Sequence, residues 1–312
     1  MILTRVMSLP QDTLLALQEA GVEVQLDAPL LKRTWWRAGG PADGLVQCPD
    51  LPTLQAVRRI ATHTGCPLFV LGNASNLLIS DAGVRGLVIR LSHDLAQIQP
   101  TPGALKLGGG VKMVVLIGRM LRHQWTGLEF MAGIPGTIGG AVRMNAGTGM
   151  GEVVDALIEV QLVLADGQLQ VQSASSLDMS YRTAHLPTGS IVATATFRLT
   201  EEDPAESRAR IDAHLARRRA TQPVDQPSCG STFRNPPGHH AGQLVEAAGL
   251  KGFQIGGALV SPLHANFIVN TGEATAADIR QVIEHVQRTV LEQTGVPLQR
   301  EVHFAGDWSG WE

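Results

Sequence analysis

Apolar residues recur with two different periods along the chain, and each period predicts its own kind of element. Helical spacing between start and stop residues predicts helices at Ser8–Gly21, Pro52–His63, Val111–Gln124, Ala205–Ala220, Gly242–Ala248 and Thr275–Gly295. Short apolar runs bounded by turn residues predict strands at Gly44–Cys48, Pro67–Leu71, Gly86–Leu91, Leu105–Leu107, Ala156–Ala165, Gln168–Ser173, Ile191–Leu199, Asn266–Asn270 and Leu298–Phe304. The stretch between Leu71 and Gly86 is interpreted as a polar turn. This mixture predicts an α+β fold, not a doubly wound parallel sheet.

Two local signals mark the ends of elements directly. Asp166-Gly167 separates two of the predicted strands, and this dipeptide is typical of a tight β-hairpin. Thr275-x-x-Asp278 resembles a helix capping box, and Gly295 follows the last turn of the same predicted helix. We therefore expect a hairpin in the middle of the chain and a capped helix near its end.

The length of 312 residues suggests two or three domains. Residues 1–33 are weakly patterned after their first helix and are interpreted as an N-terminal lead-in. The remaining chain divides into regions 34–99, 100–202 and 203–312, and Glu201-Glu202-Asp203-Pro204 marks the last boundary. We find no internal repeat and no low-complexity segment.

Composition and charge narrow the classes of function. The net charge is −3 and the apolar fraction is 44%, values of an ordinary globular protein that is not built to bind polyanions. The odd set of three cysteines has no CxxC spacing, which argues against a disulfide framework and against a zinc site. His239-His240 lies in a Pro-Gly loop and is interpreted as exposed, so no metal is expected. With no apolar run near the roughly 18 residues needed to cross a bilayer, we expect a soluble, cytoplasmic protein.

The stretch Gly133–Gly151 is rich in glycine, and apolar residues interleave the glycines. Pro135-Gly136 predicts a sharp turn inside it. Glycine at this density allows φ > 0 and close approach of a ligand to the backbone. We interpret the stretch as a backbone cradle for a flat or phosphorylated cofactor. A glycine-rich packing loop is the alternative.

The turn Leu71–Asp81 follows a strand that is predicted to be buried. Its small and amide residues, together with the Ser75 hydroxyl and exposed N–H groups, suit a pyrophosphate. An Asx-turn at the end of a strand is the alternative. The usual nucleotide signatures are missing, because the sequence has neither GxxxxGK[ST] nor a G-x-G-x-x-G that opens a helix after a strand.

Seven segments occur in an order that points to a known family. They are TWWRAGGPAD (Thr34–Asp43), LGNASNLLISDAGVRGLVI (Leu71–Ile89), GLEFMAGIPGTIGGAVRMNAG (Gly127–Gly147), SYR (Ser180–Arg182), CGSTFRNP (Cys229–Pro236), LKGFQIGGALVSPLHANFIVN (Leu250–Asn270) and LQREVHF (Leu298–Phe304). Together they resemble UDP-N-acetylenolpyruvoylglucosamine reductase (MurB), a family of FAD enzymes of peptidoglycan synthesis, from about residue 34 to residue 304.

The resemblance implies a two-subdomain FAD-binding fold of the vanillyl-alcohol-oxidase (PCMH) type, in residues 34–99 and 100–202. A smaller α/β substrate-binding domain would follow in residues 203–312. Its implied activity is the NADPH-dependent reduction of UDP-N-acetylglucosamine enolpyruvate to UDP-N-acetylmuramate with non-covalent FAD. No nucleic acid, membrane insertion or obligate protein partner is implied.

The resemblance also implies the roles of single residues. The residues that match the cofactor site are Leu71, Gly72, Asn73, Ala74, Ser75, Asn76, Leu77, Ala132, Gly133, Ile134, Pro135, Gly136, Thr137, Gly139, Gly140, Ala141, Asn145 and Gly147. Arg182, Ser231 and Glu301 match the catalytic positions. The residues expected near the substrate are Tyr181, Arg182, Asn235 and His264.

These residue types suit the implied chemistry. Hydride transfer from reduced flavin to the enolpyruvyl β-carbon would leave negative charge on the α-carbon and its carboxylate, which Arg182 would stabilise. Ser231 would donate a proton to the α-carbon, with Cys229 as a rival donor that does not match the family position. Glu301 would orient or polarise the carboxylate side. Val302 and Phe304 suit the core, so alternation in the predicted strand turns Glu301 toward solvent or a cavity.

Two departures from the family pattern refine the expectation. Ala74 occupies a turn position where the family commonly has glycine, which would cost about 1 kcal/mol if the position needs φ > 0. Tyr181 is the only tyrosine, so the tyrosine-bearing insertion of the longer class of the family is missing and the shorter class is the match. An FAD oxidase of the same fold and a non-catalytic UDP-sugar or flavin-binding regulator are the rival functions.

Overall fold

A computed structural model describes residues 9–311 of the chain, so Ser8 of the first predicted helix lies outside the described residues. The chain forms two compact units whose segments alternate along the sequence. Unit 1 comprises Asp43–Asn73, Gly86–Leu215 and, of the described residues, 9–28. Unit 2 comprises Pro29–Ala42, Ala74–Arg85 and 216–311.

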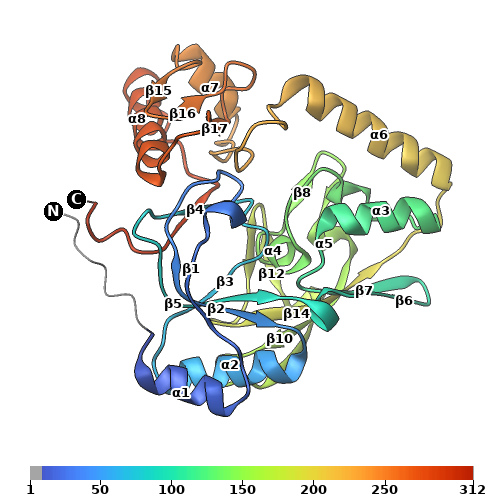
Figure 1. Cartoon of the computed structure of the whole chain (residues 1–312). Helices are drawn as coiled ribbons and strands as arrows, with labels where there is room; N and C mark the ends of the chain where they lie inside the picture. The colour runs from blue at the N-terminus through green and yellow to red at the C-terminus, as the bar shows by residue number, and fades with distance from the viewer. Residues whose placement is uncertain (1–8, 312) are drawn as a thin grey trace. The chain divides into compact units, whose positions relative to one another are not determined.

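Unit 1 carries a four-stranded sheet with the order β1-β2-β5-β3. Its strands are β1 (Gln25–Ala28), β2 (Ala42–Cys48), β5 (Val84–Leu91) and β3 (Leu68–Val70). The helices α1 (Gln11–Glu19) and α2 (Leu51–His63) lie side by side, as Figure 1 shows. Asp50 caps α2 by accepting a hydrogen bond from the Thr53 N–H, and α2 buries Leu54 and Val57 in the core of this sheet.

A second sheet of unit 1 is fully antiparallel and has the order β11-β10-β14-β7-β6. Its strands are β6 (Ile98–Thr101), β7 (Ala104–Gly108), β10 (Leu157–Val163), β11 (Leu169–Ser173) and β14 (Ile191–Arg198). The Asp166-Gly167 hairpin is confirmed, because Val163 pairs with Leu169 across it. The amphipathic helix α3 (Met113–His123) buries Leu116 and Met120 in the same hydrophobic core as the sheet.

Short elements complete unit 1. They are α4 (Ile138–Arg143), α5 (Val153–Ala156), the antiparallel pairs β8 (Gly147–Thr148)–β9 (Gly151–Glu152) and β12 (Asp178–Ser180)–β13 (Thr183–His185), and the 3₁₀ turns η2 (His93–Ala96), η3 (Glu129–Met131) and η4 (Ala174–Ser176). The long helix α6 (Pro204–Thr221) begins in unit 1 and ends in unit 2.

Unit 2 has its core around α8 (Ala276–Thr294). Its antiparallel sheet consists of β15 (Gln254–Ile255), β16 (Ala258–Val260) and β17 (Ile268–Asn270). The other elements of unit 2 are the helix α7 (Ala241–Ala247), the 3₁₀ turn η1 (Leu31–Arg33) and the parallel pair β4 (Leu77–Ile79)–β18 (His303–Ala305). The predicted capping box is confirmed, because Thr275 and Asp278 exchange hydrogen bonds. Gly295 ends α8 in the left-handed conformation.

Two strand predictions need correction. The stretch interpreted as a polar turn contains β4 (Leu77–Ile79), and the predicted strand Leu298–Phe304 is a strand only at β18 (His303–Ala305). Both short strands exist because they pair with each other across most of the chain, and a local pattern does not report such a pairing. The rest of the predicted last strand contributes one isolated bridge, Phe233–Arg300.

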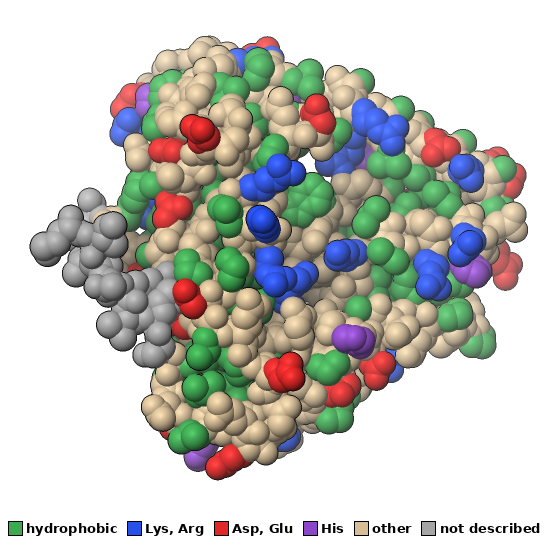
Figure 2. Space-filling view, viewed as in Figure 1, with side chains coloured by type: hydrophobic (Ala, Val, Ile, Leu, Met, Phe, Trp, Pro, Cys, Tyr) green, Lys and Arg blue, Asp and Glu red, His purple; other side chains and the backbone are tan. Residues whose placement is uncertain are grey.

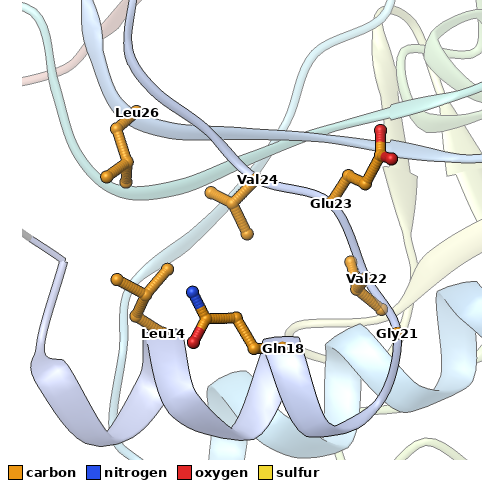
Figure 3. Close-up of a pocket in the computed structure, with 7 residues that line it drawn as sticks. All are labelled: Leu14, Gln18, Gly21, Val22, Glu23, Val24 and Leu26. Carbon is orange, nitrogen blue, oxygen red and sulfur yellow. The ribbon is translucent and has the colours of Figure 1, made fainter.

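The surface is mixed in charge. The face shown in Figure 2 carries side chains of both charges, and several of its Lys and Arg side chains gather near the middle of the view. Among the described residues, no helix is both long and apolar enough to cross a bilayer. Within residues 9–311 no group of three His, Cys, Asp or Glu side chains is arranged to hold a metal ion. An open groove between α1 and residues 21–26 (Figure 3) is lined by Leu14, Gln18 and Val24, none of which is a predicted site residue.

Candidate active site

The two predicted cofactor stretches touch each other in unit 1. The Asn73 side-chain amide donates a hydrogen bond to the Pro135 carbonyl. Gly72 lies so close to Thr137 that a Cβ at position 72 would come within 2.6 Å of the Thr137 Oγ1. The turn after β3 and the glycine-rich stretch, which are far apart in the sequence, therefore form one local surface.

The glycine-rich stretch is anchored to the turn that precedes α3. The N–H groups of Ile138 and Gly139 donate to the carbonyls of Val111 (2.9 Å) and Gly109 (2.8 Å). A Cβ at Gly139 would meet the Gly109 oxygen at 3.1 Å, so this glycine serves backbone packing. A Cβ at Gly140 would meet nothing closer than 3.6 Å, which leaves space above that position. Within the stretch, Gly139 therefore packs against the backbone of Gly109, whereas the backbone at Gly140 is open.

The turn that contains Ala74 has free backbone donors. Among the hydrogen bonds of the described residues, none uses the N–H groups of Ala74, Ser75 or Asn76. Ala74 adopts φ = 49°, so the position does require the left-handed conformation considered for it. Successive N–H groups around a left-handed residue can converge on an anion, as a pyrophosphate site requires.

Arg182 belongs to the same unit as the glycine-rich stretch. Tyr181 and Arg182 form the two-residue turn between β12 and β13, and Arg182 adopts φ = 56°. Its Nη2 donates to the Gly147 carbonyl at 3.2 Å, and its guanidinium lies 4.9 Å from the centre of the Tyr181 ring. A left-handed conformation is unfavourable for arginine, and such strain is concentrated at functional sites.

Ser231 and Glu301 lie on adjacent backbone segments of unit 2. The Glu301 N–H donates to the carbonyl of Thr232, the residue after Ser231, at 2.8 Å. The Asn76 side chain donates to the Glu301 carbonyl at 3.0 Å. Two of the three predicted catalytic residues are therefore brought together with the second half of the predicted pyrophosphate turn. Their convergence with Arg182 of unit 1 stays a prediction.

Cys229, the rival proton donor, is enclosed by protein. Its side chain is 4% exposed, and its Sγ–H faces the carbonyls of Ala74 (3.6 Å) and Leu77 (3.5 Å). Burial raises the pKa of the thiol to about 12. A thiol in this environment holds its proton and ties two turns of unit 2 together, which favours Ser231 as the donor.

The two predicted substrate residues of unit 2 also have defined surroundings. Asn235 accepts a hydrogen bond from the Ala241 N–H (3.0 Å) at the start of α7. The His264 Nδ1 accepts from the Asn266 N–H (3.3 Å), so the neutral ring carries its proton on Nε2. Burial is the main cause that lowers the pKa of His264, and Lys251 adds to the effect. His264 can therefore donate one hydrogen bond without carrying a charge.

Two buried polar residues, Asn266 and Glu129, were not singled out from the sequence. Asn266 is buried and pins Phe233 by accepting from its N–H (2.9 Å) and donating to its carbonyl (2.8 Å). Glu129, also buried, accepts from the Gly127 N–H (3.1 Å) and lies 3.7 Å from Arg210 of α6. The sequence offered one signal for both: each is a polar residue between two apolar ones, in Leu128-Glu129-Phe130 and in Ala265-Asn266-Phe267.

Comparisons with known proteins identify the family of the chain. The model of an FAD binding domain matches residues 42–173, and the model of the C-terminal domain of UDP-N-acetylenolpyruvoylglucosamine reductase matches residues 222–305. Proteins named UDP-N-acetylenolpyruvoylglucosamine reductase are similar to the chain. The one from Anaeromyxobacter dehalogenans (strain 2CP-C) is 46% identical, with 90% of this chain and 85% of the relative covered. The one from Myxococcus xanthus is 45% identical, with 92% and 94% covered.

A solved structure supports the same relationship over the whole fold. The crystal structure of UDP-N-acetylenolpyruvylglucosamine reductase (MurB) from Thermus caldophilus is 37% identical in sequence and superposes with a TM-score of 0.79. The alignment covers 91% of this chain and 98% of that chain. The expected α+β fold with an FAD-binding part of the PCMH type is thereby confirmed. The chain belongs to the UDP-N-acetylenolpyruvoylglucosamine reductase (MurB) family of FAD enzymes.

Proposed function

We propose that the chain reduces UDP-N-acetylglucosamine enolpyruvate to UDP-N-acetylmuramate with FAD as its cofactor and NADPH as its co-substrate. The observation that carries the proposal is the contact between the two predicted cofactor stretches in unit 1, with Arg182 bonded to the end of the second one. The family of the chain supports the same activity.

The residues present fit FAD. Free N–H groups at Ala74–Asn76 suit the pyrophosphate, and the open backbone at Gly140 suits a flat ring system. The stretches Leu71–Leu77 and Ala132–Gly147 contain neither histidine nor cysteine, so the cofactor would be held without a covalent link. When bound, FAD would supply the hydride, taken from NADPH, that adds to the enolpyruvyl β-carbon.

Addition at the β-carbon leaves negative charge on the α-carbon and the carboxylate of the substrate. The Arg182 guanidinium is always protonated and planar, so it can pair with that carboxylate through two N–H groups. Because the charge grows during the reaction, the pairing stabilises the transition state more than the bound substrate.

The proton that completes the reduction must reach the α-carbon from a donor on the enzyme. We assign this step to the Ser231 hydroxyl, which belongs to a partly exposed turn beside the backbone of Glu301. Glu301 would orient the carboxylate side of the substrate. Tyr181, Asn235 and His264 would contact the rest of the sugar nucleotide, with the His264 Nε2–H as a neutral donor.

Two other functions remain as alternatives to test. An oxidase of the same fold would pass electrons to oxygen, and a regulator would bind UDP-sugar or flavin without turnover. A yellow protein whose NADPH consumption depends on the enolpyruvyl substrate supports the reductase. Flavin reoxidation by oxygen alone would support the oxidase, and a colourless protein that binds UDP-sugar would support the regulator. Cytoplasmic location and the lack of an obligate partner stay predictions of the sequence.

The proton-donor role is tested by measuring the two half-reactions separately. Ser231→Ala should leave the reduction of bound flavin by NADPH within about twofold and slow flavin reoxidation by the enolpyruvyl substrate at least 100-fold, a typical size for general acid catalysis. Ser175→Ala, at an exposed serine in η4, is the matched control and should change neither rate. Equal losses in both half-reactions of Ser231→Ala would refute the proton-donor role.

A further inference from the structure

The Asn145 side chain is enclosed in unit 1 and fully engaged by protein atoms. It is 0% exposed, and its Nδ2 donates both to Glu152 Oε2 (2.7 Å) and to the Ser180 carbonyl (3.1 Å). Its Oδ1 accepts from the Val154 N–H (3.0 Å). Both amide hydrogens and the amide oxygen are therefore used, which leaves the side chain no free donor for a ligand.

These bonds close a ring of contacts around Arg182. Ser180 precedes the turn Tyr181–Arg182, and Arg182 donates back to the Gly147 carbonyl. Gly147 pairs with Glu152 across the short ladder of β8 and β9, and Glu152 accepts from Asn145. A bond at Ser180, just before the turn, and a bond from Arg182 to Gly147 thus both restrain the guanidinium.

The turn needs such a restraint. Arg182 adopts φ = 56°, a conformation that a residue with a Cβ leaves readily when its surroundings permit. The bond from Asn145 fixes Ser180 at the entrance of the turn, and the same amide group also donates to the Glu152 carboxylate.

We propose that Asn145 is a positioning residue for Arg182: its amide holds the Ser180 carbonyl and thereby sets the guanidinium for the growing negative charge of the substrate. The inference rests on the proposed function, because the charge in question arises only in that reaction. It assigns to the Asn145 side chain a role other than direct contact with the cofactor.

The test uses the full-length protein with bound FAD and an isosteric variant. Asn145→Asp replaces the NH2 group with oxygen, so Ser180 loses its donor and Glu152 faces a second carboxylate. Flavin reoxidation by the enolpyruvyl substrate should slow at least tenfold, whereas flavin reduction by NADPH should stay within twofold. In an Arg182→Ala background, Asn145→Asp should slow reoxidation by less than twofold further, because the residue that it positions is already gone.

A second variant separates positioning from stability. Asn145→Asp combined with Glu152→Gln restores a hydrogen bond between the two side chains with donor and acceptor exchanged, but it gives Ser180 no donor. This double variant should regain the melting temperature and flavin content of Glu152→Gln alone and still reoxidise slowly. Recovery of the reoxidation rate together with stability would overturn the inference, since Asn145 would then only support the fold.

The outcomes for the inference and for the proposed function are distinguishable. If wild-type protein reoxidises with the substrate and Asn145→Asp does so equally fast, the positioning role alone is refuted. The same holds if Asn145→Asp slows reoxidation by the same factor with and without Arg182. If the wild-type protein shows no substrate-dependent reoxidation, the proposed function fails and the inference fails with it.

Discussion

The backbone strain at Arg182 gives a prediction that is independent of ligand geometry. Arg182 occupies the second position of the two-residue turn between β12 and β13 with φ = 56°, where glycine is the favoured residue. Arg182→Gly and Arg182→Ala both remove the guanidinium, its bond to Gly147 and its contact with the Tyr181 ring. The two variants therefore differ only in the backbone preferences of glycine and alanine at position 182.

The expected difference follows from two opposing terms. The left-handed conformation costs a residue with a Cβ about 1–2 kcal/mol. Glycine loses about 0.5–1 kcal/mol more conformational entropy on folding than alanine does. Arg182→Gly should therefore be more stable than Arg182→Ala by roughly 0.5–1 kcal/mol. Because both variants lack the guanidinium that we propose stabilises the substrate charge, turnover should be equally low in both.

Urea unfolding at one fixed FAD concentration measures the difference, because bound ligand shifts the apparent stability by the same amount in both variants. The neighbouring pair Thr183→Gly and Thr183→Ala is the matched control. Thr183 begins the extended strand β13, so glycine should there be less stable than alanine by about 0.5–1 kcal/mol. If Arg182→Ala is as stable as Arg182→Gly, or more stable, the argument from backbone strain is wrong.

Two further predictions concern the cofactor cradle and the pH dependence of stability. Gly72→Ala should lower the flavin-to-protein absorbance ratio after gel filtration, because its Cβ would lie 2.6 Å from Oγ1 of the stiff, β-branched Thr137. Adding Thr137→Ala should restore this ratio. If the double variant has the same low ratio as Gly72→Ala, the clash is not the cause. Burial, with a smaller contribution from Asp50, raises the pKa of the Cys48 thiol to about 12, whereas an unperturbed thiol titrates at 9.0. The unfolded state therefore ionises first, and this thiol should lower the free energy of unfolding by up to about 1.4 kcal/mol per pH unit from pH 9 toward pH 12. Urea unfolding of Cys48→Ala should show a shallower pH dependence than wild type, and equal slopes would argue against the buried thiol.

Much of the candidate site could be predicted because its signals are local. The glycine-rich stretch and the turn after β3 were recognisable from residue types alone, and the order of the family segments tied Arg182, Ser231 and Glu301 to one reaction. Their surroundings could not be predicted in this way. That the thiol of Cys229 faces the carbonyls of Ala74 and Leu77 depends on segments more than a hundred residues apart.

The difference between sequence and tertiary structure has a physical reason. Helix α8 was predicted closely because its capping box and its C-terminal glycine act within a few residues, so the information lies in the segment itself. The strands β4 and β18 were missed or misjudged because three residues form a strand only when a distant partner completes their hydrogen bonds. The contacts of the Asn145 side chain and the backbone conformation of Ala74 likewise depend on the folded surroundings of these residues. The sequence by itself determined the elements and the kinds of chemistry, and the tertiary structure decided which amide holds Ser180 and which alanine takes the left-handed conformation.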